Sequence, residues 1–262
     1  MKIARFKHGG MVAYGNLRDD GTIEYLTGSP FDGQDIRGTG ESVPLSEVTL
    51  LAPVERPRIF GAGFNYVSHI KETGWEMPEV PMLFVKPESA LAGPGDAIVY
   101  PECGEVVHYE AELVVVIGRT ARRVAEAEAL DYVLGYTCGN DVSERVVQKR
   151  EMKFGCLFAG KAFETFAPIG PVISTGLDPS RLEIIGRLNG EVRQRGNTSD
   201  LLFSVPRLVS YLSSFMTLEP GDLIMTGTPA GVGTIQPGDT FEVEIEGIGT
   251  LTNHVVAEQD RP

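Results

Sequence analysis

The chain has 262 residues, 42% of them hydrophobic and 23% charged, which is the composition of a folded globular protein and excludes a disordered or collagen-like chain. Its 23 Lys and Arg residues against 36 Asp and Glu residues give a formal net charge of -13. Such a charge repels phosphate backbones and anionic lipid headgroups, so neither nucleic acid nor a membrane surface is expected as a partner.

The amino-terminal residues 1–52 predict a small β-rich domain. Short apolar groups alternate with turn residues over residues 2–6, 11–15 and 22–26, as in a β-meander. A Gly-rich polar stretch follows at residues 28–44, and Pro53 and Pro57 mark the boundary to a second domain. The first residues lack the continuous apolar core of a secretory signal, so we expect a cytoplasmic protein.

Residues 53–262 predict a larger domain that is rich in strands. Strand-sized apolar runs occur at residues 58–60, 82–85, 97–100, 113–117, 182–188, 223–225 and 240–245. Helical patterns are fewer and occur at residues 66–73, 124–132, 143–149 and 205–215. Many strands separated by loops, with few helices between them, indicate an α+β fold.

Zinc, disulfide and nucleotide sites are not expected. The cysteines Cys103, Cys138 and Cys156 form no Cys-x-x-Cys pair and have no histidine spacing typical of zinc, so we predict reduced, mostly buried thiols. Residues 61–66 lack the third glycine of a dinucleotide-binding motif. Residues 155–162 lack the hydroxyl side chain that a P-loop needs to hold magnesium.

The strongest signal for a site is Glu110-Ala111-Glu112, which leads into the apolar run 113–117. On a strand, residues two apart share a face, so the two carboxylates would lie side by side and repel each other. Asp141, in a loop before a predicted helix, offers a third carboxylate. Three carboxylates without a soft ligand favour a hard cation such as Mg²⁺ or Mn²⁺. The alternative for an isolated Glu-x-Glu pair is a solvated strand edge.

A second candidate is the pair His69 and Glu72. If residues 66–73 are helical, the two side chains lie three residues apart on one face, so the carboxylate can orient the imidazole and raise its basicity. This is the arrangement of a general base. A surface His–Glu pair is the alternative.

Two further segments are suited to bind an anion. Arg145 and Gln148 lie four and seven residues after Asp141, on the same face of the predicted helix, and a salt-bridged exposed face is the alternative. The glycine-rich loop 226–233 would present free backbone N–H groups to carboxylate or oxyanion oxygens. A tight turn would produce the same loop pattern.

In this order, the segments resemble the fumarylacetoacetate hydrolase family. The resembling stretch covers roughly residues 56–256. It includes residues 60–66, 84–87, 110–112, 140–143, 160–163, 168–171, 226–233 and 247–253. The resemblance implies a catalytic domain folded as a mixed β-sandwich roll, a homodimer, and a short β-rich amino-terminal domain of the kind that many bacterial members carry.

The resemblance also implies roles for individual side chains. Three carboxylates fall where the family binds Mg²⁺ or Mn²⁺, and Ca²⁺ in some members: Glu110, Glu112 and Asp141. A water-activating dyad on a mobile lid, and a cation beside the metal and substrate, fall at His69, Glu72 and Lys161. Substrate contacts fall at Arg145, Gln148 and Thr228.

The expected reaction is metal-dependent hydrolysis of a C–C bond in a small anionic oxo acid, a 2,4-dioxo acid of the acylpyruvate or fumarylpyruvate type. Water would be activated by the His69–Glu72 dyad, and the enolate that leaves would be stabilised by the metal. Decarboxylation or isomerisation of a 2-oxo acid, of the oxaloacetate or 2-hydroxyhepta-2,4-diene-1,7-dioate type, uses the same enolate chemistry and is the alternative. A metal-binding paralogue without catalysis is a third.

This chain departs from many relatives near the predicted site. It has Leu157-Phe158 where they carry a Gln-Trp pair, and Glu164 where they carry an aspartate. These changes leave the metal set intact but lie in a loop that borders the pocket in relatives, so substrate identity stays open.

Overall fold

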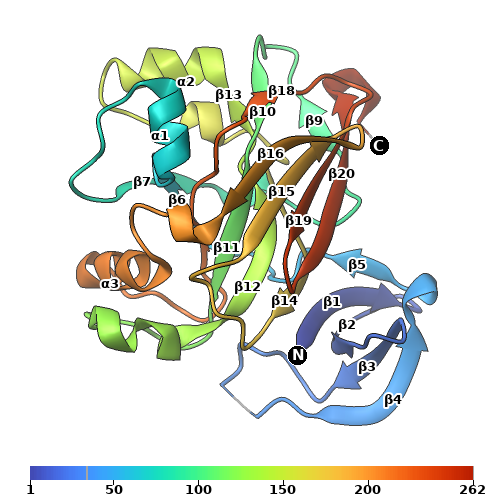
Figure 1. Ribbon diagram of the computed structural model, residues 1–262. Helices are drawn as coiled ribbons and strands as arrows, with labels where there is room; N and C mark the ends of the chain where they lie inside the picture. Colours follow the sequence, from blue (N-terminus) through green and yellow to red (C-terminus); the bar gives the residue numbers. More distant parts are fainter. Residues whose placement is uncertain (34, 262) are drawn as a thin grey trace.

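The computed structural model describes residues 1–33 and 35–261 of the protein (Figure 1). The strands are β1 (Lys2–His8), β2 (Met11–Leu17), β3 (Thr22–Leu26), β4 (Gly38–Pro44), β5 (Thr49–Leu51), β6 (Ile59–Gly63), β7 (Met82–Lys86), β8 (Leu91–Ala92), β9 (Ile98–Tyr100), β10 (Val107–Tyr109), β11 (Ala111–Ile117), β12 (Val133–Asn140), β13 (Ser143–Glu144), β14 (Ala167–Ser174), β15 (Glu183–Leu188), β16 (Glu191–Asn197), β17 (Leu223–Met225), β18 (Gly233–Thr234), β19 (Thr240–Ile245) and β20 (Gly249–Ala257). The α-helices are α1 (Val67–Thr73), α2 (Arg145–Met152) and α3 (Val205–Phe215). Short 3₁₀ helices are η1 (Leu45–Glu47), η2 (Glu88–Ala90), η3 (Glu126–Tyr132), η4 (Ala159–Lys161), η5 (Thr198–Asp200) and η6 (Glu258–Asp260).

The described strands form three sheets. The largest runs in the order β4-β3-β2-β1-β14-β12-β11-β17-β6-β7, with β5 paired to β1 and β8 paired to β14. A five-stranded sheet, β16-β15-β19-β20-β9, packs against β11, β12 and β14, and β13-β10-β18 forms a small third sheet (Figure 1). Antiparallel pairs dominate, but β17 and β6 are parallel, as are β20 and β9. The predicted strand-rich α+β sandwich is confirmed.

The core lies on both faces of β11, every residue of which is buried. Leu113 and Val115 belong to the apolar cluster that includes the five-stranded sheet, whereas Val114 and Val116 belong to a second cluster on the other face. Because successive side chains of a strand point to opposite faces, a strand buried on both sides needs an unbroken apolar run. The run 113–117 is therefore explained by its central place in the largest sheet.

The amino-terminal strands continue the largest sheet. Strand β1 pairs with β2 and β5, and also with β14, where Ile3 lies opposite Ile173. In Figure 1 these strands form the blue lobe beside the ends of β14 and β20. The hydrogen bonds between β1 and β14 join the two sides of the predicted boundary. The division of the chain into two domains at residue 52 therefore stays a prediction.

Most predicted elements are present, and helix α3 has the predicted bounds. The side chain of Ser204 accepts a hydrogen bond from the backbone N–H of Arg207 and caps this helix. Three expectations differ from the structure. Residues 126–132 form a 3₁₀ helix, residues 143 and 144 are extended so that α2 begins only at Arg145, and β4 lies in the Gly-rich stretch for which no strand was predicted.

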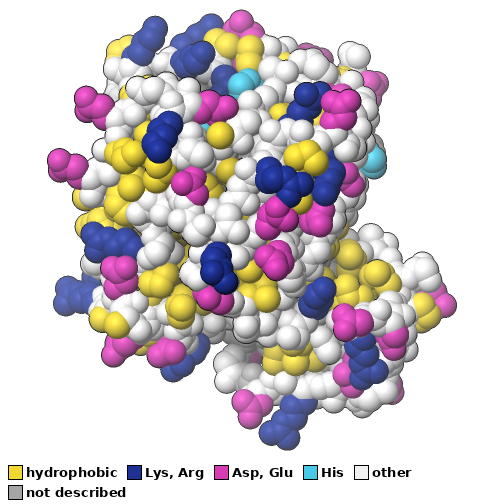
Figure 2. All heavy atoms as spheres, in the orientation of Figure 1, with side chains coloured by type: hydrophobic (Ala, Val, Ile, Leu, Met, Phe, Trp, Pro, Cys, Tyr) yellow, Lys and Arg dark blue, Asp and Glu magenta, His cyan; other side chains and the backbone are white. Residues whose placement is uncertain are grey.

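The surface shown in Figure 2 has basic and acidic side chains interspersed. None of the helices within residues 1–33 and 35–261 combines the length and apolar character needed to span a membrane. The expectation for the thiols is wrong in part, because Cys103 and Cys156 are exposed and only Cys138 is buried.

Candidate active site

Three carboxylates meet where β11 begins beside the end of β12. Strand pairing places Ala111 opposite Asn140, and the N–H of Asp141 donates to the carbonyl of Glu110 at 2.9 Å. Glu110, Glu112 and Asp141 each offer an oxygen, and these oxygens lie within 4.8 Å of one another. All three residues are buried. The structure thus assembles the three predicted ligands in one cluster rather than on a solvated strand edge.

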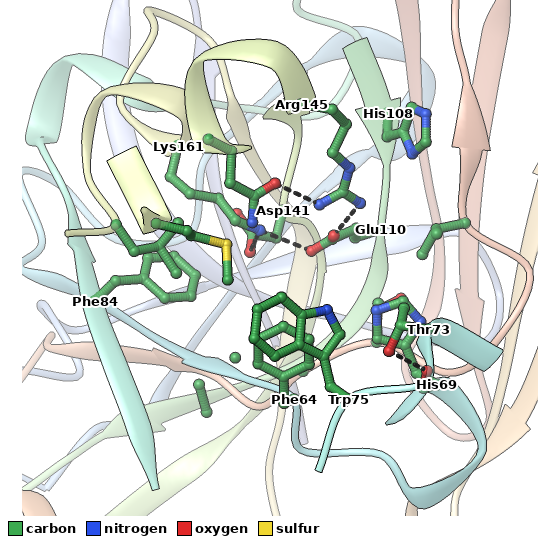
Figure 3. Close-up of a pocket in the computed structure, with 18 of the residues that line it drawn as sticks. Phe64, His69, Thr73, Trp75, Phe84, His108, Glu110, Asp141, Arg145 and Lys161 are labelled. Atoms are coloured by element: carbon green, nitrogen blue, oxygen red, sulfur yellow. Dashed lines mark hydrogen bonds and ion pairs between the residues drawn. The ribbon is translucent and has the colours of Figure 1, made fainter. Parts of the chain in front are cut away.

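Two buried lysines and an arginine lie against this cluster. Lys161 Nζ is 2.8 Å from Glu110 Oε2 and 2.5 Å from Asp141 Oδ2. Lys86 Nζ is 2.5 Å from Asp141 Oδ1 and also donates to the carbonyl of Val142. Arg145 forms an ion pair with Glu110 (Figure 3). The negative charges of Glu110 and Asp141 are therefore balanced within the protein, as buried charges require.

The environment acts differently on the carboxylates. Burial alone would raise the pKa of Glu110, but Lys161 and Arg145 outweigh it and lower that pKa. Glu112 has no ion-pair partner among the described residues and accepts a hydrogen bond from the N–H of Gly227 at 2.8 Å. Burial, Asp141 and Glu110 raise its pKa well above the usual value. A divalent cation would remove this repulsion, and an all-oxygen donor set is the chemistry that Mg²⁺, Mn²⁺ and Ca²⁺ prefer.

The lysines are affected in opposite directions. Burial lowers the pKa of Lys86 to about 8, although Asp141 opposes the shift. Burial also acts to lower the pKa of Lys161, but Asp141 and Glu110 outweigh it, and the pKa is raised. Lys161 is thus held as a cation between Glu110 and Asp141.

The predicted His–Glu pair is present on α1. His69 is only 8% exposed, and its Nδ1 lies 3.3 Å from Glu72 Oε2. Both oxygens of Glu72 also accept the N–H of Gly231 at 3.2 Å. With Nδ1–H directed to a carboxylate, the ring keeps its Nε2 lone pair for another partner. Glu72 therefore orients His69 and connects α1 to the loop 226–233.

The entry to α1 is fixed by side-chain hydrogen bonds. Asn65 donates to the carbonyls of Phe203 and Thr226 and accepts the N–H of Phe203. The N–H of Ser68 donates to Asp200 at 2.9 Å. Trp75, after the helix, packs on Phe64 with ring centroids 5.3 Å apart. The segment that carries His69 is thereby held against the rest of the site.

Helix α2 carries Arg145 and Gln148, the residues predicted to contact substrate, but its geometry differs from the predicted one. Because the helix begins at Arg145, Asp141 lies outside it and does not share its face. Within the helix, Arg145 Nη1 donates to Gln148 Oε1 at 2.8 Å. Glu144 caps the helix by accepting the N–H of Val147 at 2.6 Å. Arg145 reaches Glu110 because residues 143 and 144 are extended and pair with β10, and not because of helical spacing from Asp141.

Thr228 lies in the wall of the site, but its hydroxyl is already engaged. It donates to the carbonyl of Ala111 at 2.9 Å and accepts from Gln194 Nε2 at 2.7 Å. Gln194 also accepts the N–H of Ala111 at 2.9 Å. These bonds attach the loop 226–233 to the start of β11. The groups that this loop can offer to a ligand are the backbone N–H groups without a partner among the described residues that line the cavity, those of Thr228 and Val232.

Most of these side chains line one cavity of about 290 Å³. Eight of the predicted residues line it: His69, Glu110, Glu112, Asp141, Arg145, Gln148, Lys161 and Thr228. Glu72 lies behind His69. The buried lining residues, called here the inner wall, include the carboxylates and Lys161. The partly or fully exposed ones, called the mouth, are Gly63, Phe64, Thr73, Trp75, Val106, His108, Arg145, Lys149, Met152, Leu157 and Val232 (Figure 3).

Sequence reasoning missed two side chains that position the site. Lys86 was marked only as part of the family resemblance, although a lysine within an apolar strand is itself a signal of a buried partner. Glu151, at the end of α2, accepts the backbone N–H groups of Phe158, Ala159 and Gly160 at 3.3, 2.7 and 3.0 Å. These residues immediately precede Lys161, so Glu151 fixes the turn that carries it.

Two family models match the chain, one in each part. Residues 58–256 match the model described as fumarylacetoacetate (FAA) hydrolase C-terminal, and residues 1–53 match one described as Rv2993c-like, N-terminal. The protein therefore belongs to the fumarylacetoacetate hydrolase family, and the resemblance seen in the sequence is confirmed.

Similar proteins carry several activities in their names. The solved structure of 5-carboxymethyl-2-hydroxymuconate delta-isomerase from Mycobacterium smegmatis matches with a TM-score of 0.90 at 43% identity, covering 98% of this chain and 100% of that one. The 4-hydroxyphenylacetate degradation bifunctional isomerase/decarboxylase of Salmonella dublin is 45% identical over 204 residues, 77% of this chain and 47% of that protein. Maleylpyruvate hydrolase from Sphingobium sp. SYK-6, solved with manganese (II) ion and pyruvate, matches with a TM-score of 0.80 at 32% identity, covering 98% and 99%.

Proposed function

We propose that the protein is a divalent-metal-dependent hydrolase that cleaves a C–C bond in a 2,4-dioxo acid of the acylpyruvate or fumarylpyruvate type. The observation that carries the proposal is the His69–Glu72 pair, with Nδ1 3.3 Å from the carboxylate, in the wall of the cavity that also holds the three-carboxylate cluster. A base oriented in this way, beside a cation site, is suited to activate water.

The cofactor of the proposal is Mg²⁺ or Mn²⁺, with Ca²⁺ as a further candidate, held by Glu110, Glu112 and Asp141. Such an ion supplies Lewis acidity and a chelation point for the 2-oxo acid end of the substrate. The manganese (II) ion and pyruvate in the similar maleylpyruvate hydrolase support this choice.

The side chains of the cavity account for the remaining chemistry. His69 removes a proton from water, and the hydroxide equivalent adds to the 4-carbonyl carbon. The bond between carbons 3 and 4 then breaks, its electron pair passes to carbon 3 as the pyruvate enolate, and protonation of that carbon completes pyruvate. The second product is the acid derived from the acyl group, so water is consumed and both products are carboxylates.

Charge that develops in this reaction meets fixed donors. The Lys161 ammonium lies at the inner wall, where the 2-oxo acid end would bind. The backbone N–H groups of Thr228 and Val232, which line the cavity and have no partner among the described residues, stabilise the oxyanion at carbon 4, and the Thr228 hydroxyl holds the loop in place. Arg145 and Gln148 bind the end of the substrate remote from the 2-oxo acid group. We also propose that the protein is a homodimer, as the family resemblance implies. Sedimentation of the purified protein measures its mass in solution and so tests this.

A second candidate is a decarboxylase, isomerase or tautomerase acting on a 2-oxo acid. This chain is 43% identical to the isomerase of Mycobacterium smegmatis and 45% identical to the bifunctional isomerase/decarboxylase of Salmonella dublin, but only 32% identical to the maleylpyruvate hydrolase. These identities favour the second candidate. Bacillus subtilis oxaloacetate tautomerase YisK, at 43% identity, adds the third activity. In that case His69 would transfer a proton to or from the substrate carbon instead of activating water.

The test is product analysis with a panel of acids. Purified protein is incubated with acetylpyruvate, fumarylpyruvate, oxaloacetate and a 2-oxo-heptenedioate, each with Mg²⁺, Mn²⁺ or EDTA, and pyruvate, CO₂ and isomerised acid are quantified. The hydrolase produces pyruvate and a second acid without CO₂, and EDTA abolishes the reaction. Stoichiometric CO₂ or isomerised acid, with acylpyruvates untouched, would replace the proposal by the second candidate. Metal binding without turnover of any acid would mark a non-catalytic paralogue.

A further inference from the structure

His108 faces the cavity from the middle of β10. Its neighbours in that strand, Val107 and Tyr109, are buried in the main apolar cluster, so the alternation of the strand turns His108 to the opposite face. Strand pairing places His108 opposite Ser143 on one side and Thr234 on the other. The backbone of this small sheet therefore fixes where the imidazole lies in the mouth of the cavity.

His108 differs from the other histidines in its hydrogen bonding. Nδ1 of His8, His69 and His254 each has a protein partner, at 2.7, 3.3 and 2.8 Å. Nδ1 of His108 is buried and has no hydrogen-bond partner among the residues that the structure describes. Leaving such a group without a partner destabilises the folded state. Because Nδ1 is shielded and has no acceptor, the ring proton is better placed on Nε2, which is not among the shielded atoms and can donate to a ligand in the cavity.

The surroundings of His108 specify the chemistry of that ligand. Arg145 is next to it, and Lys149 lines the same mouth. In Figure 3, His108 lies on the other side of Arg145 from Asp141 and Lys161. The carboxylates that also act on His108, those of Glu110 and Glu144, are already bonded to Arg145 and Lys161 and to backbone N–H groups, respectively. The groups left for a ligand here are therefore hydrogen-bond donors. An oxygen acceptor, and a carboxylate above all, complements them.

We propose that His108 is a specificity-determining residue that, beside Arg145, donates a hydrogen bond to a carboxylate at the end of the substrate remote from the 2-oxo acid group. This inference rests on the proposed function, because it assigns that remote end to the mouth of the cavity. In this role, His108 favours 2,4-dioxo acids that end in a second carboxylate over those that end in an alkyl group.

The test measures binding rather than turnover. Protein carrying His69→Ala, which blocks water activation, is loaded with Mn²⁺ and titrated calorimetrically with pyruvate, acetylpyruvate and fumarylpyruvate, with and without His108→Phe. We expect His108→Phe to weaken fumarylpyruvate binding about 10- to 100-fold, the value of one hydrogen bond to a charged group. Acetylpyruvate and pyruvate should change by less than about twofold, because neither carries the second carboxylate.

Two controls keep the result specific. His108→Asn retains a donor and should recover part of the affinity for fumarylpyruvate, whereas His254→Phe, on the far strand β20, should change none of the three affinities. Equal weakening of acetylpyruvate and fumarylpyruvate, or no weakening, would overturn the inference while leaving the proposed function intact. If the parent protein binds pyruvate but neither acylpyruvate, the proposed function fails, and this inference fails with it.

Discussion

The inner wall and the mouth of the cavity are built in different ways. At the inner wall, Glu110 and Asp141 are paired with Lys161, and all three are buried. At the mouth, Trp75 is 57% exposed and the ring nitrogen Nδ1 of His108 has no partner within the described chain. The inner wall comes from the ends of central strands, whereas much of the mouth comes from α1 and the segments that follow α1 and α2. Helix α1 contributes to both regions, with His69 at the inner wall and Thr73 at the mouth. In the proposed function the inner wall carries the chemistry and the mouth contributes to substrate selection.

The largest effect is expected at Asp141, the shared partner of two buried lysines. Asp141→Asn leaves Lys86 and Lys161 without this countercharge, and breaking a buried pair in this way costs about 3–5 kcal/mol. Urea denaturation should show this loss, together with loss of metal binding. Asp131→Asn, at an exposed position, is the control and should stay within about 0.5 kcal/mol. Unchanged stability of Asp141→Asn would mean that the inner wall does not depend on this charge balance.

The next effect is expected in turnover at His69. His69→Ala should lower kcat about 10²- to 10⁴-fold, as loss of a general base does. Because His69 has one side-chain partner on its own helix, the unfolding midpoint should change little. Steady-state kinetics measure the first quantity and thermal unfolding the second. Hydrolysis at near full rate would remove His69 from the mechanism.

A smaller effect is expected at Glu151, which positions Lys161 from outside the cavity. Glu151→Ala removes the acceptor of three backbone N–H groups, two of them at exposed positions where water can replace it, at a cost of about 0.5–1.5 kcal/mol in unfolding free energy. We expect kcat to fall more than KM changes, since Lys161 would be displaced and the mouth would not. Glu151→Gln, which keeps one acceptor oxygen, should recover part of kcat. Equal kinetics for the Ala and Gln variants would assign Glu151 a structural role only.

The smallest effect is expected at Trp75 in the mouth. Its ring packs on Phe64, a contact worth about 0.5–1.5 kcal/mol. Trp75→Ala should raise KM about 2- to 10-fold, leave kcat nearly unchanged, and lower stability by no more than about 1.5 kcal/mol, the upper value of that contact. A large fall in kcat with constant KM would contradict the separation between inner wall and mouth.

Residues that act through local spacing could be predicted from the sequence. Glu110 and Glu112 follow the two-residue period of a strand, and His69 and Glu72 follow the helical period. Helix α3 was predicted with its bounds because Ser204 and an early proline mark its start. In each case the relevant partner lies within a few residues along the chain.

Features that depend on distant partners could not be predicted. Lys86 pairs with Asp141 across 55 residues, and Gln194 bonds to Ala111 across 83 residues. The helical face assigned to Asp141 was wrong because residues 143 and 144 pair with β10, and tertiary pairing outweighs local helical preference there. The partners that balance a buried charge come together only when the chain folds. Local sequence patterns therefore do not identify them.

The central claim, that water is consumed to cleave a C–C bond, is tested most directly with oxygen-18-labelled water. The protein is incubated in this water with Mn²⁺ and fumarylpyruvate, and the products are examined by mass spectrometry. The account predicts one labelled oxygen in a carboxylate of the released fumarate and one pyruvate per fumarate, with no CO₂. Release of CO₂, or an isomerised acid without label in a carboxylate, would contradict it.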